Sequence, residues 1–318
     1  MDTTRARLTF ETGDAIAALP YASPGVRLLA RSLGVSLAAV HGTGGNGRIT
    51  RGDVINHVQR AMQTTAGMPK LSNTETSPPP LPREDYAAYG SIERRTLSRI
   101  RQRSGAALQR NWLSIPHVTN HEEADITELE AFRLRLNEQH QHAGVRFTLL
   151  ALVIKAAIVA LKQFPEFNAS LDGEQMVLKR YYHIGFAADT ADGLLVPVIR
   201  NADQKGLLEL AQESAALAAR ARDGKLTATD MRGGSFTISS LGGIGGTHFT
   251  PIIHAPQVAI LGMGKALTRV CWDGAAAVPR LILPLSLSWD HRAVDGAAAA
   301  RFNALLARVL TDFRLAIL

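Results

Sequence analysis

The chain has 318 residues, of which 46% are hydrophobic, and it carries a formal charge of +7. This length suits about two domains of ~150 residues each, and the apolar content can fill a sizeable core, which excludes disorder throughout. The single cysteine, Cys271, excludes an intramolecular disulfide framework and a cysteine-based zinc site, and it favours a reducing compartment. We therefore expect a cytoplasmic protein. The first residues contain no apolar h-region, so no signal peptide is predicted.

The positive charge permits nucleic-acid binding but does not establish it. Aromatic residues make up only 6% of the chain and are not interleaved with basic ones, so we expect no nucleic-acid partner. The apolar segment 148–164 has Lys155 at its centre and is shorter than the ~20 residues that cross a bilayer. It predicts a buried core helix and no membrane span.

The first folded unit is predicted over residues 20–60. Ser23 suits the N-cap of a helix that has proline in its first turn, and Gly34 suits its end. Thr50 is the expected N-cap of a second helix. The glycine-rich run 42–47 between them looks like a dinucleotide-binding loop, but such a loop should leave a strand and open a long helix. We therefore reject that interpretation.

Composition divides the rest of the chain. Residues 1–19 are expected to be an N-terminal tail or linker remnant, and residues 61–90 a linker rich in proline, serine and threonine, which should act as a semi-extended tether. Residues 91–318 are expected to form one large domain of mixed helices and strands. Its predicted helices span residues 97–112, 125–138, 207–222 and 297–310. Its predicted strands span residues 182–188, 194–199, 234–239, 258–263 and 281–289.

A histidine and a carboxylate follow the last predicted strand. His291 and Asp295 follow the apolar stretch 281–289, which is predicted to be a buried strand. A neutral histidine, with an unperturbed pKa of ~6.5, can remove a proton from a thiol whose pKa is ~8.5. The pattern therefore indicates an acyl-transfer site, although taken alone it also fits an ordinary turn at the end of a strand.

Several motifs together resemble one known family. In the small unit they are Ser23-Pro24-x-Val26-Arg27, then Gly42-Thr43-Gly44-x-x-Gly47-Arg48-Ile49 followed by Asp53-Val54. In the large domain they are Phe236–Gly243, Ala255–Gly262 and Asp290-His291-Arg292-x-x-Asp295-Gly296. Over about residues 20–318 the chain strongly resembles the E2 component (dihydrolipoamide acyltransferase) of 2-oxo acid dehydrogenase complexes. The resemblance implies the α/β class, with a chloramphenicol-acetyltransferase-like catalytic domain preceded by a small helical peripheral subunit-binding domain.

The resemblance also implies roles for individual residues. His291 would be the general base that deprotonates coenzyme A or dihydrolipoamide, and Ser239 would place a hydroxyl at the oxyanion. Ser240 is the alternative for that role, and a structural serine at a strand end is the other interpretation of Ser239. Asp295 would organise the site by pairing with an arginine, for which Arg99 resembles the family's candidate. No metal motif is found, and four other histidines that lack ligand spacing are expected to be surface or core residues; they are His117, His121, His248 and His254.

In the small unit, Arg27 and Arg48 match positions through which the family binds an acidic face of its partners. Those partners are dihydrolipoamide dehydrogenase (E3) and the 2-oxo acid decarboxylase (E1), bound through residues 20–60; a solvated basic surface is the alternative. The resemblance further implies a homotrimer, with each active site between two chains, that assembles into a larger core of 24 chains. The apolar tail at residues 315–318 favours a second contact between trimers.

The expected reaction is transfer of an acetyl group between dihydrolipoamide and coenzyme A, because residues 110–119 and 125–130 are most similar to the pyruvate type of the family. Another acyl group (succinyl or branched-chain), a free-standing acyltransferase and a non-catalytic scaffold are the alternatives. Family members usually begin with lipoyl domains, and none precedes Pro20 in this sequence. Either the sequence is shortened at its start, or its lipoyl group is supplied by another polypeptide.

Overall fold

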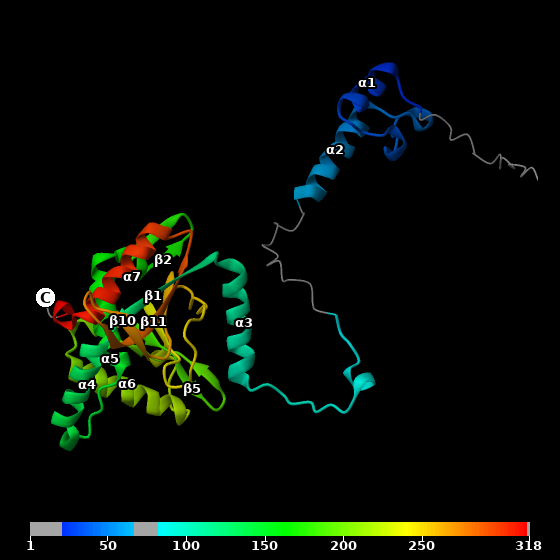
Figure 1. Cartoon of the computed structure of the whole chain (residues 1–318). Helices are drawn as coiled ribbons and strands as arrows, with labels where there is room; N and C mark the ends of the chain where they lie inside the picture. Colours follow the sequence, from blue (N-terminus) through cyan, green and yellow to red (C-terminus); the bar gives the residue numbers. More distant parts are fainter. Residues whose placement is uncertain (1–20, 67–81, 317–318) are drawn as a thin grey trace, which may run out of the picture. The chain divides into compact units, whose positions relative to one another are not determined.

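The computed structural model describes residues 21–66 and 82–316. Contacts divide the chain into two compact units, with the division between Ile92 and Glu93, and Figure 1 shows the elements of each unit. The expected tail 1–19 and the middle of the expected linker lie outside the described residues. Across the described parts of the chain, no helix has both the length and the apolar character needed to cross a bilayer.

The small unit is a pair of helices, α1 (Pro24–Ser32) and α2 (Arg51–Ala66), joined by short 3-10 turns. Thr50 is confirmed as the cap of α2, because its Oγ1 accepts the Asp53 backbone N–H at 3.3 Å. Ser23 occupies the N-cap of α1, but its side chain makes no capping bond. The unit closes on a small apolar cluster of buried residues: Val26, Ala30, Val40, Ile49 and Val54.

One carboxylate ties the loop between α1 and α2 to the start of α2. Asp53 accepts the backbone N–H and hydroxyl of Thr43 at 3.0 and 2.7 Å, and those of Thr50 at 2.8 and 2.9 Å. These bonds, led by the Thr50 backbone N–H, hold the pKa of Asp53 well below its usual range. A Cβ at Gly42 would lie 2.4 Å from the Gly47 carbonyl oxygen. The glycine at this position therefore permits close backbone approach within a compact loop.

The second unit contains the large mixed domain, whose elements follow in chain order. Its helices are α3 (Arg99–Ser114), α4 (Thr127–Gln139), α5 (Leu149–Gln163), α6 (Leu207–Arg222) and α7 (Gly296–Thr311). Its strands are β1 (His117–Asp125), β2 (Ala169–Asp172), β3 (Gln175–Leu178), β4 (Ile184–Phe186), β5 (Ala188–Thr190), β6 (Gly193–Leu195), β7 (Val198–Ile199), β8 (Phe236–Ser240), β9 (Ala259–Met263), β10 (Leu267–Trp272) and β11 (Ala277–Asp290).

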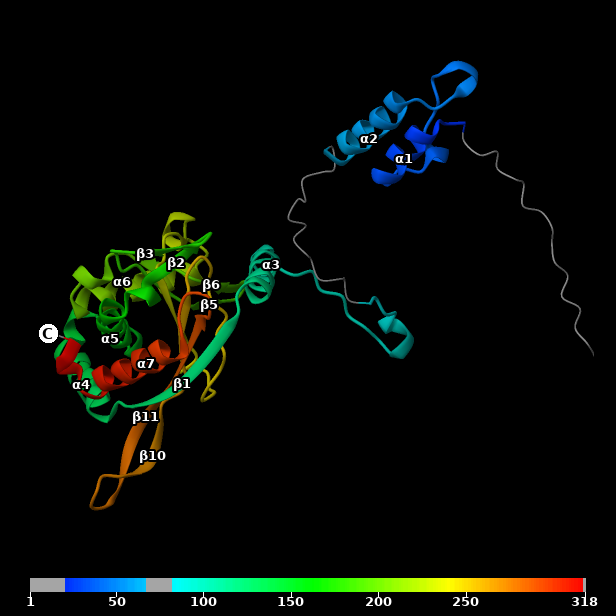
Figure 2. The ribbon, with the colours of Figure 1, turned by 90° about the horizontal axis from the view of Figure 1, so that it is seen from above.

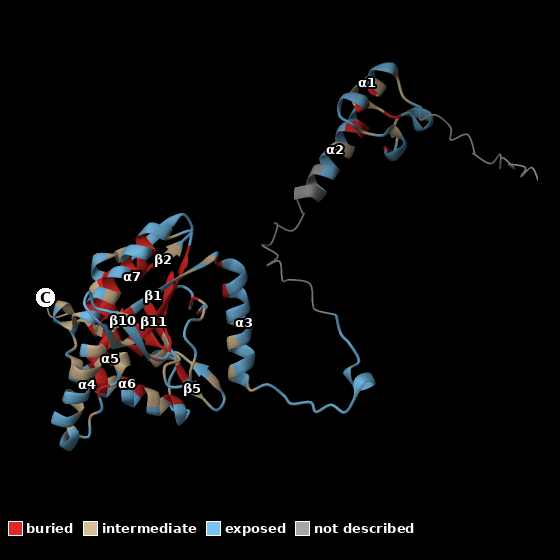
Figure 3. Ribbon diagram, viewed as in Figure 1, coloured by how far each residue is buried: buried red, intermediate tan, exposed pale blue. Residues whose placement is uncertain are grey.

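Among the described residues, the main sheet has seven strands in the order β1-β11-β9-β8-β4-β7, with β10 paired to β11 outside that path. The pairs β4–β8 and β8–β9 are parallel, and the other pairs are antiparallel. Such a sheet needs cover on at least one face. Figure 3 shows that the sheet and α5 contain much of the buried part of this unit, whereas α3 is largely exposed.

The two faces of the sheet differ because side chains alternate along each strand. On β11, Leu283, Leu285 and Leu287 join the main core cluster with residues of α5 and α7. Ser286 and Ser288 point to the other face, where the Ser288 hydroxyl lies 2.8 Å from that of Thr119. One face is therefore apolar and covered by helices, and the other is polar.

Several expectations from the sequence are confirmed in detail. The segment with Lys155 forms α5, and most of its residues are buried. The helix predicted over residues 207–222 has those same bounds.

The prediction of a single strand over residues 194–199 was wrong. This segment forms two strands in different sheets, because β6 pairs with β5 and β7 pairs with β4. Strand β1 was not expected, since its charged and polar residues hide the alternation that identifies a strand.

We expect the small unit to lose stability at acid pH through Asp53, the one acidic residue between positions 21 and 66. The pKa of Asp53 is lowered in the folded state. Its contribution to the free energy of unfolding is therefore fully present above the unfolded pKa of ~3.9 and decreases as the pH falls below that value. Amide exchange of buried Val54 should therefore accelerate below about pH 4. Asp53→Asn should exchange faster at neutral pH and show a weaker acid dependence; an unchanged acid dependence would refute this assignment.

Candidate active site

The long strand β11 positions the candidate histidine at its C-terminal end. The strand runs between β1 and β9 and is buried from Ile282 to Asp290. His291 is the first residue after it, and its backbone N–H donates to the Pro116 carbonyl at 3.1 Å, next to the start of β1. The backbone beneath the imidazole is therefore anchored on a neighbouring segment.

The ring of His291 rests against a buried tryptophan. The ring centroids of Trp289 and His291 are 4.7 Å apart, and the Trp289 indole N–H donates to the Asn120 amide oxygen at 2.7 Å. Trp289 is almost fully buried in the core, whereas His291 is exposed. Neither ring nitrogen of His291 has a hydrogen-bond partner among residues 21–66 and 82–316. One nitrogen is thus available to accept a proton from another molecule.

The two residues on either side of His291, Asp290 and Arg292, form an ion pair. The carboxylate of Asp290 accepts the backbone N–H of Arg292 at 3.0 Å and two guanidinium N–H groups at 3.0 and 2.7 Å. The Asp290 side chain is 3% exposed and that of Arg292 is 52% exposed. This bonding raises the pKa of Arg292. Both residues stood in the sequence motif, but their mutual contact was not inferred from it.

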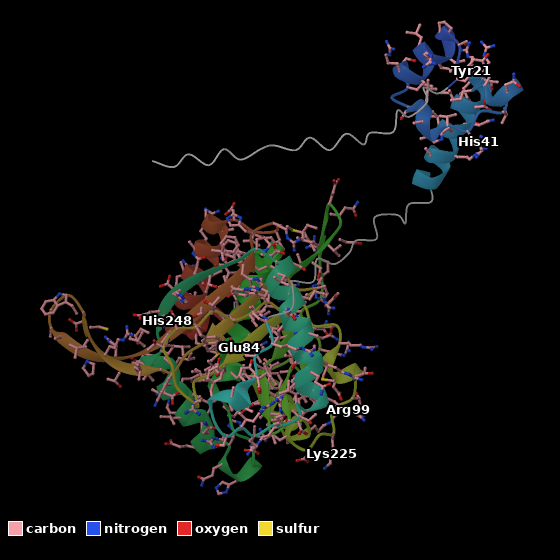
Figure 4. All side chains as sticks on the ribbon, turned by 90° about the vertical axis from the view of Figure 1, so that its right-hand side faces the viewer. Tyr21, His41, Glu84, Arg99, Lys225 and His248 are labelled. Atoms are coloured by element: carbon pink, nitrogen blue, oxygen red, sulfur yellow. The ribbon has the colours of Figure 1, made fainter. Side chains whose placement is uncertain are left out.

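Asp295 caps the helix that follows. Its side-chain oxygen accepts the Ala298 backbone N–H at 2.7 Å, at the N-terminus of α7. The sequence led us to expect a pairing with Arg99, which is the first residue of α3 (Figure 4). Within the described chain, no ion pair joins these two residues. The structure therefore gives Asp295 a capping contact in place of the expected ion pair.

The candidate oxyanion serine lies at the end of β8. Ser239 is half-buried and Ser240 is exposed. In the described part of the protein, no hydrogen-bond partner is found for the Ser239 hydroxyl. The nearby hydroxyl of Thr237 is by contrast buried and donates to the Gln257 amide oxygen at 2.7 Å. Of these two side chains on the same face, Ser239 is the one left to bond another molecule.

The structure does not bring Ser239 and His291 together within one chain. Ser239 pairs with Gly262, which also pairs with Ser286, so Ser239 lies level with Ser286. His291 is five residues farther along, which is about 17 Å at ~3.3 Å per residue, and β8 is two strand spacings of ~4.8 Å from β11. A single thioester carbonyl therefore cannot contact both groups of one copy.

A cavity of about 250 Å³ lies beside the histidine turn. It is formed by the C-terminal part of α3, the segment before β9 and the ion pair at the end of β11. Its lining includes Arg110, Asn111, Ser114, Gln257, Asp290 and Arg292. Polar groups at this opening could receive part of a molecule whose reactive end approaches His291.

The other histidines are structural or exposed. The two ring nitrogens of His117 bond the Ile115 carbonyl at 2.8 Å and the Ile253 N–H at 3.0 Å. His121 contacts the ring of His248, and burial, followed by His248, lowers the pKa of His121. No cluster of three potential metal ligands occurs within the described residues.

The two arginines expected to bind partners lie in the small unit. The guanidinium of Arg48 lies 5.6 Å from the ring centroid of Tyr21. The Nε–H of Arg27 donates to the Ala22 carbonyl at 3.2 Å. Tyr21 is labelled in Figure 4, where it marks the position of this contact on the unit. Each guanidinium is thus oriented by a local contact at the start of the unit.

Family comparison identifies the class of both units. Residues 89–318 match the model of the "2-oxoacid dehydrogenases acyltransferase (catalytic domain)", and residues 20–55 match the "e3 binding domain" model. The larger unit therefore has an acyltransferase fold, and the smaller one is a binding domain. The chain belongs to the 2-oxoacid dehydrogenase acyltransferase family, and the predicted α/β catalytic domain preceded by a small helical binding domain is confirmed.

Individual relatives are similar over most of the chain. The dihydrolipoyllysine-residue acetyltransferase component of the pyruvate dehydrogenase complex from Cupriavidus necator is 56% identical over 300 residues, covering 92% of this chain and 54% of that protein. The Azotobacter vinelandii counterpart is 52% identical over 297 residues, covering 92% and 47%. The chain thus spans about half the length of these and two further curated relatives that it matches.

Among solved structures, the Azotobacter vinelandii dihydrolipoamide acetyltransferase matches with a TM-score of 0.74 and 55% identity, over 76% of this chain and 100% of that one. In that enzyme, a serine, a histidine and an asparagine have been investigated for their roles in the catalytic mechanism. The same two sequence intervals separate Ser239, His291 and Asp295 here. The third position therefore carries a carboxylate in this chain where the relative has an amide.

We expect Asp290→Ala to destabilise the larger unit by about 1–3 kcal/mol, because it removes charge-assisted bonds made by a buried carboxylate. Urea unfolding measures the effect. Asp312→Ala is the matched control, since Asp312 forms the same two-residue contact with Arg314 at the surface, where the Arg314 side chain is 87% exposed. That variant should unfold as the wild type does. Equal effects of the two substitutions would contradict a structural role for the Asp290 pair.

Proposed function

We propose that this protein is the acetyltransferase component (E2) of a pyruvate dehydrogenase-type complex, and that it transfers an acetyl group between dihydrolipoamide and coenzyme A. The observation that carries the proposal is the exposed imidazole of His291, anchored through its backbone and left without a partner at both ring nitrogens. Family membership supports the reaction class. The acetyl group is supported by relatives that are named as acetyltransferases of pyruvate dehydrogenase complexes.

In the proposed reaction, a ring nitrogen of His291 takes the proton from the thiol of coenzyme A. The resulting thiolate attacks the carbonyl carbon of the acetylated dihydrolipoamide and forms a tetrahedral oxyanion. Collapse of this intermediate breaks the original carbon–sulfur bond, and the departing thiolate takes the proton back from the imidazolium. The products are acetyl-coenzyme A and free dihydrolipoamide, and the same steps run in reverse.

Ser239 supplies the hydroxyl that donates to the oxyanion. A single donor of this kind lowers the barrier by roughly 3 kcal/mol. Two observations support Ser239 over Ser240: its place at the matched interval and its half-buried position. Ser240 is exposed, and its hydroxyl would be surrounded by water, where a donor is worth less.

Asp295 acts as a positioning residue through its helix cap. An aspartate and an asparagine both cap helices well, but only an aspartate can form an ion pair with an arginine. The asparagine in the Azotobacter vinelandii enzyme at the same interval therefore fits the capping role, and so does the bond from Ala298 N–H to Asp295. Under this proposal Arg99 has no catalytic role through Asp295.

The active site is shared between two copies of the chain. The separation of Ser239 from His291 along the sheet supports this arrangement, with histidine from one copy and serine from the next. A ring of three copies completes three such sites, and trimers would assemble into a larger core of 24 chains. A large assembly of this kind is supported by a solved structure of the cubic core of a pyruvate dehydrogenase complex, whose chain is 56% identical in sequence to this one.

We expect His291→Ala to reduce thiol-dependent acetyl exchange by about 10²–10⁴-fold and Ser239→Ala by roughly 10²–10³-fold. Ser240→Ala should change the rate little. Unfolding the two inactive variants together and refolding the equal mixture should restore about one quarter of wild-type activity, since each ring interface pairs one intact histidine with one intact serine at that frequency. Loss of less than tenfold in His291→Ala would refute the catalytic role, and mixtures without recovery would refute the shared site.

Residues 20–60 bind dihydrolipoamide dehydrogenase (E3), and also the decarboxylase (E1), through Arg27 and Arg48. The match of residues 20–55 to the E3-binding model supports this partner. The fixed fork of an arginine suits carboxylates on an acidic partner surface. Helix α2 continues through Ala66, so the part of the predicted tether 61–90 that follows this helix would separate the binding domain from the catalytic domain at 91–318. We also propose a cytoplasmic location, which the single cysteine supports.

Arg48→Glu is expected to weaken E3 binding by about tenfold or more, because it reverses a charge that faces an acidic surface and also removes the contact with Tyr21. Titration calorimetry of the full chain with E3 measures the effect at low and high salt. Arg31→Glu, an exposed arginine of α1 outside the motif, makes the same change of charge and should weaken binding less. Equal losses for both variants would indicate a general charge effect without a specific site.

A further inference from the structure

The β2–β3 hairpin carries a fixed lysine at its base. Lys179 is the residue after β3, and its backbone N–H donates to the Asn168 carbonyl at 3.1 Å, just before β2. The buried side-chain amide of Asn168 donates to the carbonyls of Lys179 and Tyr181, each at 3.0 Å. Figure 2 shows this hairpin at the periphery of the larger unit. The backbone of Lys179 is therefore held at both its N–H and its carbonyl.

The side-chain amine of Lys179 has a neutral partner. Its Nζ donates to the Ala169 carbonyl at 3.0 Å, and within the described residues no ion pair includes it. Lys225, by contrast, is paired with the carboxylate of Asp223 at 3.0 Å. A carboxylate would stabilise the ammonium form of an amine. Without one, burial of the Lys179 amine favours its uncharged form.

Lys179 lines a cavity of about 310 Å³. This volume is about ten times the ~30 Å³ that a water molecule occupies in the liquid, so an acetyl group and its sulfur can enter. The other titratable residues of the lining are Tyr181, Arg232 and His254, and the described lining contains no aspartate or glutamate. The cavity thus gives a small electrophile access to an amine that has no counterion.

The cavity adjoins the candidate active site. It shares Ala255, Pro256 and Gln257 with the cavity beside the His291 turn. The Pro256 carbonyl also accepts the hydroxyl of Ser170, on β2, at 2.5 Å. An acetyl thioester formed at His291 is therefore produced close to Lys179.

Burial makes the Lys179 amine a nucleophile near neutral pH. Desolvation lowers the pKa of Lys179 to about 8. At about pH 7.5, roughly a quarter of such amines are uncharged, compared with about one in a thousand for an ordinary lysine with a pKa of ~10.4. Only the uncharged amine has the lone pair that attacks a carbonyl carbon. Lys179 should therefore react faster than a more exposed lysine that stays charged.

We propose that Lys179 is a site of acetylation at Nζ by acetyl thioesters, with acetyl-coenzyme A as the donor. The donor rests on the proposed function, of which it is a product, but the reaction uses no catalytic residue. The amine nitrogen attacks the acetyl carbonyl carbon and forms a carbon–nitrogen bond. The carbon–sulfur bond then breaks, and the departing thiolate takes the proton that the nitrogen loses. The products are an uncharged acetyl-lysine and free coenzyme A.

Incubation of the full chain with acetyl-coenzyme A at about pH 7.5 tests the proposal. Deuterated acetic anhydride then caps the remaining amines of the unfolded chain, so that mass spectrometry of one digest gives the acetylated fraction of each lysine. Lys179 should react at least tenfold faster than Lys225, whose side chain is 71% exposed and is labelled in Figure 4. In concentrated urea this advantage should disappear, because no cavity remains. A Lys179 that is no faster than Lys225 in the folded chain, or an advantage that persists in urea, would overturn the proposal.

A matched pair of variants tests the effect of the missing carboxylate. Tyr181→Glu places a carboxylate in the cavity lining, two residues from Lys179, and should slow acetylation of Lys179 at least threefold by stabilising the ammonium. Tyr181→Gln removes the same ring without adding a charge and should react faster than the glutamate variant. Tyr181 is 41% exposed, so neither change should unfold the domain. Equal rates of Lys179 acetylation in the two variants would contradict the proposal.

His291→Ala separates this inference from the proposed function. With added acetyl-coenzyme A, this variant should acetylate Lys179 at the wild-type rate, and a loss of that reaction would overturn the inference. A wild type that lacks acetyl exchange but acetylates Lys179 would refute only the acetyltransferase function. An active wild type in which Lys179 stays unmodified would refute only the acetylation site.

Discussion

The alternation of side chains along β11 is the constraint on which the larger unit depends. Leucines at every second position enter the core with α5 and α7, and serines between them face the polar side of the sheet. A shift of one residue in register would exchange these two sets, so the pairing of β11 with its neighbours is strongly specified. That register fixes where the strand ends, and hence where His291 emerges. The position of the candidate catalytic group is thus a consequence of core packing.

The sheet around β11 also keeps the two candidate catalytic groups, the imidazole and the serine, apart within one chain. At its C-terminal end, the imidazole is supported by a buried indole and an anchored turn, while both of its nitrogens remain available. The serine that would complete the chemistry lies level with Ser286, farther back along β11 and on another strand. Rigidity of the sheet keeps these groups apart within a chain. Under the proposed shared site, assembly would be a condition of catalysis as well as of architecture.

The small unit is stabilised in a different way from the larger unit. Its apolar cluster is modest, and a buried carboxylate with four hydrogen bonds closes the loop between its helices. Small domains have little apolar surface to bury, so a satisfied polar network contributes a larger share of their specificity. The arginines proposed to bind partners lie on a scaffold held in this way.

Much of the fold and of the candidate site could be predicted from local sequence. Helix α6 and the core helix α5 followed from apolar periodicity and end signals, and the family motifs located Ser239, His291 and Asp295. Strand β1 escaped prediction because its alternation is masked by polar residues that face a polar side of the sheet. The pairing of Asp295 with Arg99 was expected from resemblance, whereas the structure shows a helix cap.

The sequence by itself determined the two-domain order, the class of each domain and the chemical identity of the site residues, because these depend on composition and short motifs. Only the tertiary structure decided that Asp290 clamps Arg292, that Trp289 supports His291, and that Ser239 lies about 17 Å along the sheet from that histidine. These relations depend on strand order and register, which arise from long-range pairing between segments that no local pattern specifies.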